Sequence, residues 1–202
     1  MALGTLFIIS APSGAGKTSL VSELSGELEN IQVSVSHTTR DSRPGEQNAV
    51  NYHFVSQTQF EAMVADGQFL EHAQVFGNYY GTSEAWVNNT LDQGIDVILE
   101  IDWQGAQQVR EKVARSKSIF ILPPSKQALV KRLQARGQDK AAVIEKRIAA
   151  ATEEMSHYTE ADYLVINDDF ELALQQIKSI IVGHRCLMPV EGHEKLLADL
   201  LS

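Results

Sequence analysis

Short apolar runs recur along the chain, and most of the intervals between them have helical periodicity. The runs that predict strands are residues 6–9, 31–35, 97–101, 119–122 and 163–166. Between them, apolar residues recur at the spacing of one helix face, which predicts helices at 19–28, 106–113, 141–155 and 172–182. Strands that alternate with helices indicate a parallel sheet covered by helical layers, so the predicted fold class is α/β.

Two segments interrupt this alternation. Residues 36–89 are rich in polar residues, turns and aromatics, and residues 126–149 form a helical stretch dense in lysine and arginine. Ligands of open α/β sheets bind at the carboxyl ends of the strands, so both segments are interpreted as insertions at that edge. We expect a single domain over residues 1–202, whose core combines 1–35, 90–125 and 150–202.

Composition and charge narrow the possible partners. The net charge of −9 repels polyanions over the surface as a whole, which argues against nucleic acid as a partner. The N-terminus lacks a secretion signal, and no apolar stretch approaches the roughly 18 residues of a membrane span. Cys186 is the only cysteine and cannot form an internal disulfide. These features predict a cytoplasmic chain that does not bind a membrane.

A glycine-rich turn follows the first apolar run. The residues Ala11, Pro12, Ser13, Gly14, Ala15, Gly16, Lys17 and Thr18 match three of the four specified positions of the pattern G-x-x-x-x-G-K-[ST]. Such a loop directs backbone N–H groups at phosphate oxygens, and the following helix turns its positive N-terminus toward the same anion. Lys17 would add a cation and Thr18 a ligand for Mg²⁺. This phosphate loop (P-loop) predicts binding of a nucleoside triphosphate.

The departure at the first position leaves an alternative. Ala11 stands where the pattern has glycine, so the segment also fits a glycine-rich turn that carries a solvated lysine. The apolar strand before the turn favours the phosphate-binding interpretation.

Polar residues of the first insertion form a second group of candidates. Arg40 and Arg43 lie three residues apart on one loop, and their guanidinium groups suit phosphate oxygens. Further along the chain come Tyr52, Glu71 and a turn that carries Tyr80 and Thr82. Taken singly, an exposed arginine pair is usually a solvated loop and a Tyr-Tyr turn usually packs. Their occurrence together with a P-loop favours binding of a phosphorylated ligand.

Two carboxylates end a strand candidate. Glu100 and Asp102 follow branched apolar residues, where a desolvated charge is costly unless it is paired or linked to a metal. A structural ion pair is one explanation. The other is that they lie near Mg²⁺ or the second substrate, as carboxylates of P-loop kinases do. None of the six histidines has a spacing typical of zinc ligands, so we expect no zinc site.

The order of these motifs over essentially the whole chain resembles that of bacterial guanylate kinases, which transfer a phosphoryl group from ATP to GMP. The resemblance implies a P-loop kinase core, a GMP-binding lobe at 36–89 and a helical lid at 126–149. It also implies that the GMP phosphate is held by Arg40, Arg43, Tyr52 and Tyr80, and that the guanine is read or supported by Ser36, Glu71, Thr82 and Asp102, with Glu100 on the same side.

On the ATP side, the resemblance implies that arginines of the lid close over the nucleotide. Arg132, Arg136 and Arg147 are the candidates, with Arg136 and Arg147 as the catalytic pair beside Lys17, and Asn167 lies next to the adenine. Mg²⁺ would arrive with ATP and bind Thr18. The same arginines also fit a solvated helix face, and Asn167 a polar turn at a strand end.

Guanine chemistry supports the inherited role of Glu71. Guanine presents an N1–H and an N2 amino group side by side, and one carboxylate accepts from both, whereas adenine has an unprotonated N1 there. Two rival functions stay open: a P-loop kinase for another small phosphorylated acceptor, and a non-catalytic protein-binding module of the same fold. The oligomeric state is not predicted.

Overall fold

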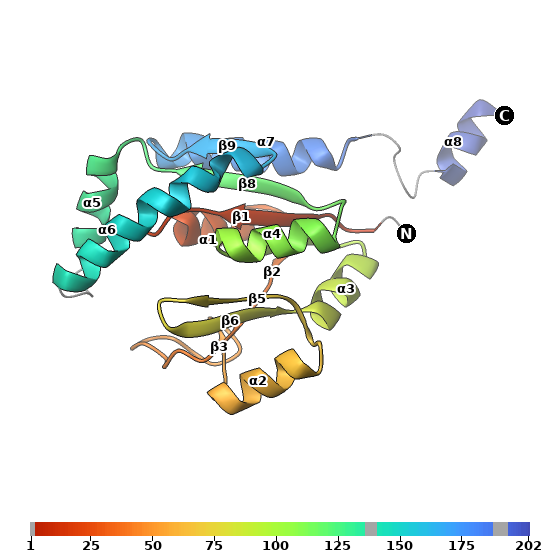
Figure 1. Ribbon diagram of the computed structural model, residues 1–202. Coiled ribbons are helices and arrows are strands. Elements are labelled where there is room, and N and C mark those ends of the chain that lie inside the picture. Colours follow the sequence, from red (N-terminus) through yellow and green to blue (C-terminus); the bar gives the residue numbers. More distant parts are fainter. Residues whose placement is uncertain (1–2, 136–140, 188–193) are drawn as a thin grey trace.

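A computed structural model describes residues 3–135, 141–187 and 194–202, and it contains two sheets (Figure 1). The larger sheet is parallel throughout and has the strand order β2-β7-β1-β8-β9. Its strands are β1 (Leu6–Ser10), β2 (Ile31–Val33), β7 (Asp96–Glu100), β8 (Lys117–Leu122) and β9 (Tyr163–Ile166). All five predicted strands are therefore present, and the α/β class is confirmed.

Helices cover both faces of the larger sheet because successive strand residues point to opposite sides. Phe7 and Ile9 pack on one face with the buried residues of α1 (Lys17–Glu27) and α7 (Phe170–His184). Ile8 packs on the other face with α3 (Glu84–Asp92) and α4 (Trp103–Lys112). Figure 1 shows α4 and α1 on opposite sides of β1.

The smaller sheet has the order β4-β3-β6-β5 and is built from the first insertion. Its strands are β3 (His37–Thr38), β4 (His53–Phe54), β5 (Phe69–Val75) and β6 (Asn78–Ser83). Helix α2 (Gln57–Ala65) covers it through Phe60, whose ring stacks on Phe69 at 4.7 Å between centroids. The sequence predicted none of these elements. Strands β3 and β4 have only two residues each, and the longer strands β5 and β6 lack the strict alternation of apolar and polar residues that indicates a strand.

The remaining helices follow β8 and α7. Helices α5 (Lys126–Ala135) and α6 (Ala141–Ser156) pack through Leu129, Leu133 and Ala151, and the 3-10 helix η1 (His157–Glu160) follows α6 directly. Near the C-terminus, α8 (Glu194–Leu201) lies apart from the rest of the molecule in Figure 1. None of the helices in the described part of the chain combines the length and the apolar character needed to cross a membrane.

Three helices, α1, α4 and α7, begin earlier than the apolar periodicity predicted. Helix α7 starts at Phe170, because the carboxylate of Asp169 accepts a hydrogen bond from the backbone N–H of Leu172 at 2.8 Å. Helix α1 starts at Lys17, immediately after Gly16, whose positive φ of 95° ends the P-loop. Helix α4 starts at Trp103, because the carboxylate of Asp102 accepts a hydrogen bond from the backbone N–H of Gly105 at 2.9 Å.

The sheet core predicts a clear stability contrast. Ile98 is fully buried in β7, so Ile98→Ala should lower the free energy of unfolding by about 2–5 kcal/mol through lost burial and the cavity it leaves. Leu172 on α7 is more than half exposed, so Leu172→Ala should change it by less than about 0.5 kcal/mol. Urea denaturation measures both, and equal losses would contradict this assignment of the core.

Candidate functional site

A cleft lies at the carboxyl ends of β1 and β7, where the P-loop faces residues of the smaller sheet. On one side it is lined by the P-loop and by the start of α4, including Asp102 and Trp103. Val75 and Phe76, at the end of β5, line the other side. A ligand in this cleft therefore contacts both sheets.

Backbone conformation makes two glycines of the P-loop necessary. Gly14 and Gly16 have φ of 91° and 95°, in the left-handed region that side chains other than hydrogen disfavour. A Cβ at Gly16 would also collide with the side-chain amide of Asn167. The loop therefore curls tightly at the N-terminus of α1, the geometry that binds phosphate through backbone N–H groups.

Side chains at the start of α1 reach the ends of the neighbouring strand. The ammonium of Lys17 donates to the carbonyl oxygen of Ile101 at 2.9 Å, and the hydroxyl of Thr18 donates to the carboxylate of Glu100. Hydroxyl and carboxylate oxygens are ligands that Mg²⁺ prefers. Thr18 and Glu100 therefore fit a magnesium ion that also binds nucleotide phosphates, either directly or through water.

Three further residues hold the P-loop from outside. The Asn167 amide donates to the carbonyl of Ala15 at 2.7 Å, and Arg132 donates to the carbonyl of Asn167 at 2.9 Å. The carboxylate of Glu154 on α6 accepts from the backbone N–H of Ser13 at 2.9 Å. No pattern in the sequence indicated Glu154, because a carboxylate in a charged helix carries no signal of a partner 141 residues away. The predicted contact between Asn167 and adenine stays a prediction.

In the first insertion, Arg40 lies against two aromatic rings and a carboxylate. Its guanidinium donates to both carboxylate oxygens of Glu46, at 2.8 and 2.9 Å, and lies 5.4 Å from the ring centroid of Tyr52. The hydrogen bonds from Arg40 lower the pKa of the Glu46 carboxyl. The Tyr52 and Tyr80 rings meet edge to face at 6.0 Å. Three of the four residues expected at the GMP phosphate are thus together.

The other phosphate candidate differs. The backbone N–H of Arg43 donates to Glu46 at 2.7 Å, and the residue is exposed. Glu46 therefore organises the whole loop from Arg40 to Arg43. No pattern in the sequence indicated Glu46, since an acidic residue beside two arginines is usually part of a surface ion pair.

Glu71 is a buried carboxylate, only 2% exposed, and accepts a hydrogen bond from the Thr82 hydroxyl at 2.6 Å. Burial raises the pKa of Glu71 to about 7, and the nearby Asp102 carboxylate adds to this effect. Two of the residues expected to read guanine are therefore in direct contact. Ser36 lies at the start of the smaller sheet, where its carbonyl accepts from the N–H of His53.

The expected lid pair is not settled by this geometry. Arg136 lies outside the described residues, and Arg147 belongs to the part of α6 whose side chains are outside the described set. Among the described residues, no group of three or more His, Cys, Asp or Glu side chains could hold a metal ion.

Comparisons with known proteins identify the family of this chain. The family model of guanylate kinase matches residues 4–184. The chain belongs to the guanylate kinase family. The guanylate kinase of Saccharophagus degradans is 60% identical over 201 residues, with 98% of both chains covered. That of Hahella chejuensis is 61% identical over 191 residues, with 95% of this chain and 92% of the relative covered.

A solved structure of another guanylate kinase has the same fold as this chain. The crystal structure of guanylate kinase from Anaplasma phagocytophilum superposes with a TM-score of 0.81 at 32% identity, and covers 98% of this chain and 95% of that one. The resemblance seen in the order of motifs is confirmed, and the chain is a nucleotide-binding kinase.

The raised pKa of Glu71 predicts how stability depends on pH. Between pH 4.5 and about 7, the folded protein keeps a proton on Glu71 that an unfolded glutamate releases. The contribution of Glu71 to the free energy of unfolding is therefore full below pH 4.5 and is lost as the pH rises through 7. From pH 5 to 8 the loss should reach about 3 kcal/mol at most. Urea denaturation of the wild type and of Glu71→Gln at both pH values measures this loss. The free energy of unfolding of the variant should lack this pH-dependent loss, and the same pH dependence in both proteins would contradict the prediction.

Proposed function

We propose that this chain transfers the γ-phosphoryl group of ATP to GMP and so forms ADP and GDP. One observation carries the proposal. A P-loop with Lys17 and Thr18 lines a cleft that Val75 and Phe76 also line, and the smaller sheet to which Val75 belongs carries a buried carboxylate, Glu71. Membership of the guanylate kinase family supports the same assignment.

On the ATP side, the backbone of residues 11–16 would bind the phosphates, with Lys17 as the cation that offsets their charge. The hydrogen bond from the Lys17 ammonium to the carbonyl oxygen of Ile101 holds this side chain just after β7, beside the P-loop. Thr18 and Glu100 would hold Mg²⁺ with the ATP phosphates, and the bound ion neutralises phosphate charge. Asn167 would lie near the adenine, and Arg136 and Arg147 would close over the transferred group.

On the GMP side, Arg40, Arg43, Tyr52 and Tyr80 would bind the phosphate. The Arg40 guanidinium is already oriented by Glu46, so little side-chain entropy is lost when a phosphate binds. Glu71 would accept from N1–H and N2–H of guanine, with support from Thr82, Ser36 and Asp102. The pKa near 7 means that guanine binding favours the ionised carboxylate and releases a proton at neutral pH.

Phosphoryl transfer needs alignment and charge neutralisation more than covalent chemistry by the protein. A cleft bounded by both sheets provides alignment, because the acceptor phosphate and the donor phosphates approach from opposite walls. We also propose the division into a core, a GMP-binding lobe at 36–89 and a lid at 126–149, in a chain that acts in the cytoplasm and binds no nucleic acid. Its single cysteine suits a reducing compartment.

A coupled assay of ADP formation tests the reaction directly. With ATP and magnesium, GMP should be the accepted substrate while AMP, CMP and UMP give less than about 1% of its rate, because only guanine pairs two donors with Glu71. Lys17→Ala should lower turnover at least about 100-fold through lost stabilisation of the transferred charge.

The matched control is Lys178→Ala, which removes a lysine that pairs with Glu27 on the surface, away from the cleft residues. It should leave turnover within about twofold of wild type. ATP binding without transfer to any nucleotide would favour the protein-binding module, and transfer to another acceptor would favour the second rival.

Base selection is tested by Glu71→Gln. The amide presents an N–H where guanine also presents N–H, so kcat/KM for GMP should fall about 100-fold while the Kd for ATP stays within about twofold. Glu61→Gln on α2 is the control, since Glu61 is exposed and bonds only to Gln57 in the hydrogen bonds described. Equal losses of GMP and ATP binding would rule out this role.

A further inference from the structure

The main-chain segment around Glu71 is held by a helix of the other sheet. Strand β5 is an edge strand of the smaller sheet, and its pairing with β6 shifts register between Phe69 and Glu71. Such irregularities redirect side chains and leave backbone groups without strand partners. Helix α4, which packs on the larger sheet, meets β5 at this place.

Gln108 of α4 pairs with the residue after Glu71 as a neighbouring strand would. Its amide nitrogen donates to the carbonyl of His72 at 2.8 Å, and its amide oxygen accepts from the N–H of His72 at 3.2 Å. On the other side of Glu71, the ammonium of Lys112 donates to the carbonyl of Leu70 at 2.6 Å. Helix α4 therefore holds the backbone on both sides of the buried carboxylate.

The helix also leaves room for that carboxylate. A Cβ at position 105 would lie 2.5 Å from Oε2 of Glu71, shorter than real Cβ contacts, and 3.2 Å from its Cδ, so the carboxylate would have to shift. By contrast, a Cβ at Gly183 in α7 would meet nothing within 4 Å. The space at position 105 is therefore occupied by Glu71, whereas Gly26 and Gly183, the other glycines in the described helices, face open space.

We propose that Gly105 and Gln108 are positioning residues for base recognition: Gln108 fixes the backbone of His72, and Gly105 admits the carboxylate of Glu71 against α4. The inference rests on the proposed function, since it takes Glu71 as the group that reads guanine. Without Gln108, β5 would lose the partner that sets the direction of Glu71. With a methyl group at position 105, the carboxylate would be displaced.

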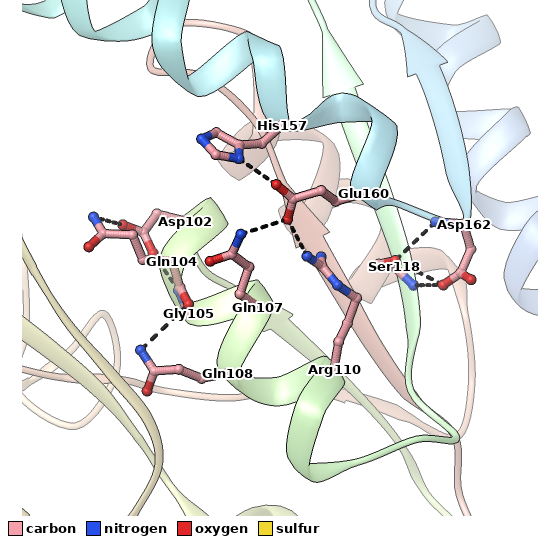
Figure 2. Close-up of polar contacts among 10 residues, drawn as sticks. All are labelled: Asp102, Gln104, Gly105, Gln107, Gln108, Arg110, Ser118, His157, Glu160 and Asp162. Carbon is pink, nitrogen blue, oxygen red and sulfur yellow. Dashed lines mark hydrogen bonds and ion pairs between the residues drawn. The ribbon is translucent and has the colours of Figure 1, made fainter.

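The adjacent residue Gln107 provides a matched control. Its amide donates to Glu160 of η1 at 3.0 Å, and Arg110 donates to the same carboxylate. Figure 2 shows Gln107 and Arg110 pointing toward Glu160, with Gln108 directed away from it. Gln107→Leu and Gln108→Leu thus make the same chemical change at neighbouring positions of α4 whose side chains have different partners.

Steady-state kinetics with GMP and IMP test the proposal, because IMP is GMP without the N2 amino group. Gln108→Leu should raise KM for GMP about tenfold, leave kcat within about twofold and reduce the preference for GMP over IMP about fivefold. Gln107→Leu should leave all three within about twofold. Equal losses with GMP and IMP, or equal effects of the two variants, would overturn the proposal.

A second pair separates displacement of Glu71 from general damage to a helix. Gly105→Ala should reduce the preference for GMP over IMP at least as much as Gln108→Leu does, whereas Gly183→Ala should not change it. Because alanine favours helix, the thermal midpoint of Gly183→Ala should not fall. Unchanged base preference in Gly105→Ala would contradict the steric argument.

A titration that uses no nucleotide keeps this inference distinct from the proposed function. Carbon-13 NMR should give Glu71 a pKa of about 7 in the wild type, and Gln108→Leu should lower it by exposing the carboxylate to water. An unchanged pKa in Gln108→Leu would overturn the positioning role. If the wild type showed no preference for GMP, the proposed function would fail, and this titration would still decide whether Gln108 positions Glu71.

Discussion

The parallel pairing of β1 with β7 is the constraint on which the rest of the site depends. It places Ile9 beside Glu100, so the loop that leaves β1 and the carboxylates that end β7 emerge at the same edge. Only then can Thr18 reach Glu100 and Lys17 reach Ile101. The pairing is strong because both strands are buried on both faces, where a register slip would move large apolar side chains into the wrong layer.

Helix α4 connects this edge to the smaller sheet. Its first turn is capped by Asp102, one of the carboxylates beside the cleft, and its next turns contact β5 through Gly105, Gln108 and Lys112. On its other side Trp103 stacks on His157 with 3.7 Å between centroids, and Arg110 pairs with Glu160. A single short helix thus contacts the strand that carries Glu71 and the segment that follows α6.

Two buried carboxylates in this protein, Glu71 and Asp96, are compensated to different degrees. Glu71 is buried with Thr82 as a hydrogen-bond partner, and Asp96 is buried with the backbone N–H of Thr5 and the guanidinium of Arg185. Burial of a carboxylate costs free energy unless hydrogen bonds or charges offset it. At Asp96 the arginine supplies that charge. At Glu71 the hydrogen bond does not fully offset the cost of burial, so the pKa of this carboxyl is raised.

The sequence by itself determined the α/β class and the five strands of the larger sheet, because these depend on local periodicity. It also determined the P-loop motif, which is contiguous, and the family, which follows from the order of several motifs along the chain. It also named Arg40, Tyr52, Glu71, Tyr80 and Thr82. It could not reveal the smaller sheet, because β3 and β4 have only two residues each and β5 and β6 carry no strict alternation of apolar and polar residues. Nor could it identify Glu46, Glu154 or Gln108, since a common polar side chain carries no local sign of its partner. Only tertiary structure brought these groups to the backbone and side chains that they hold, because those contacts join residues on separate elements.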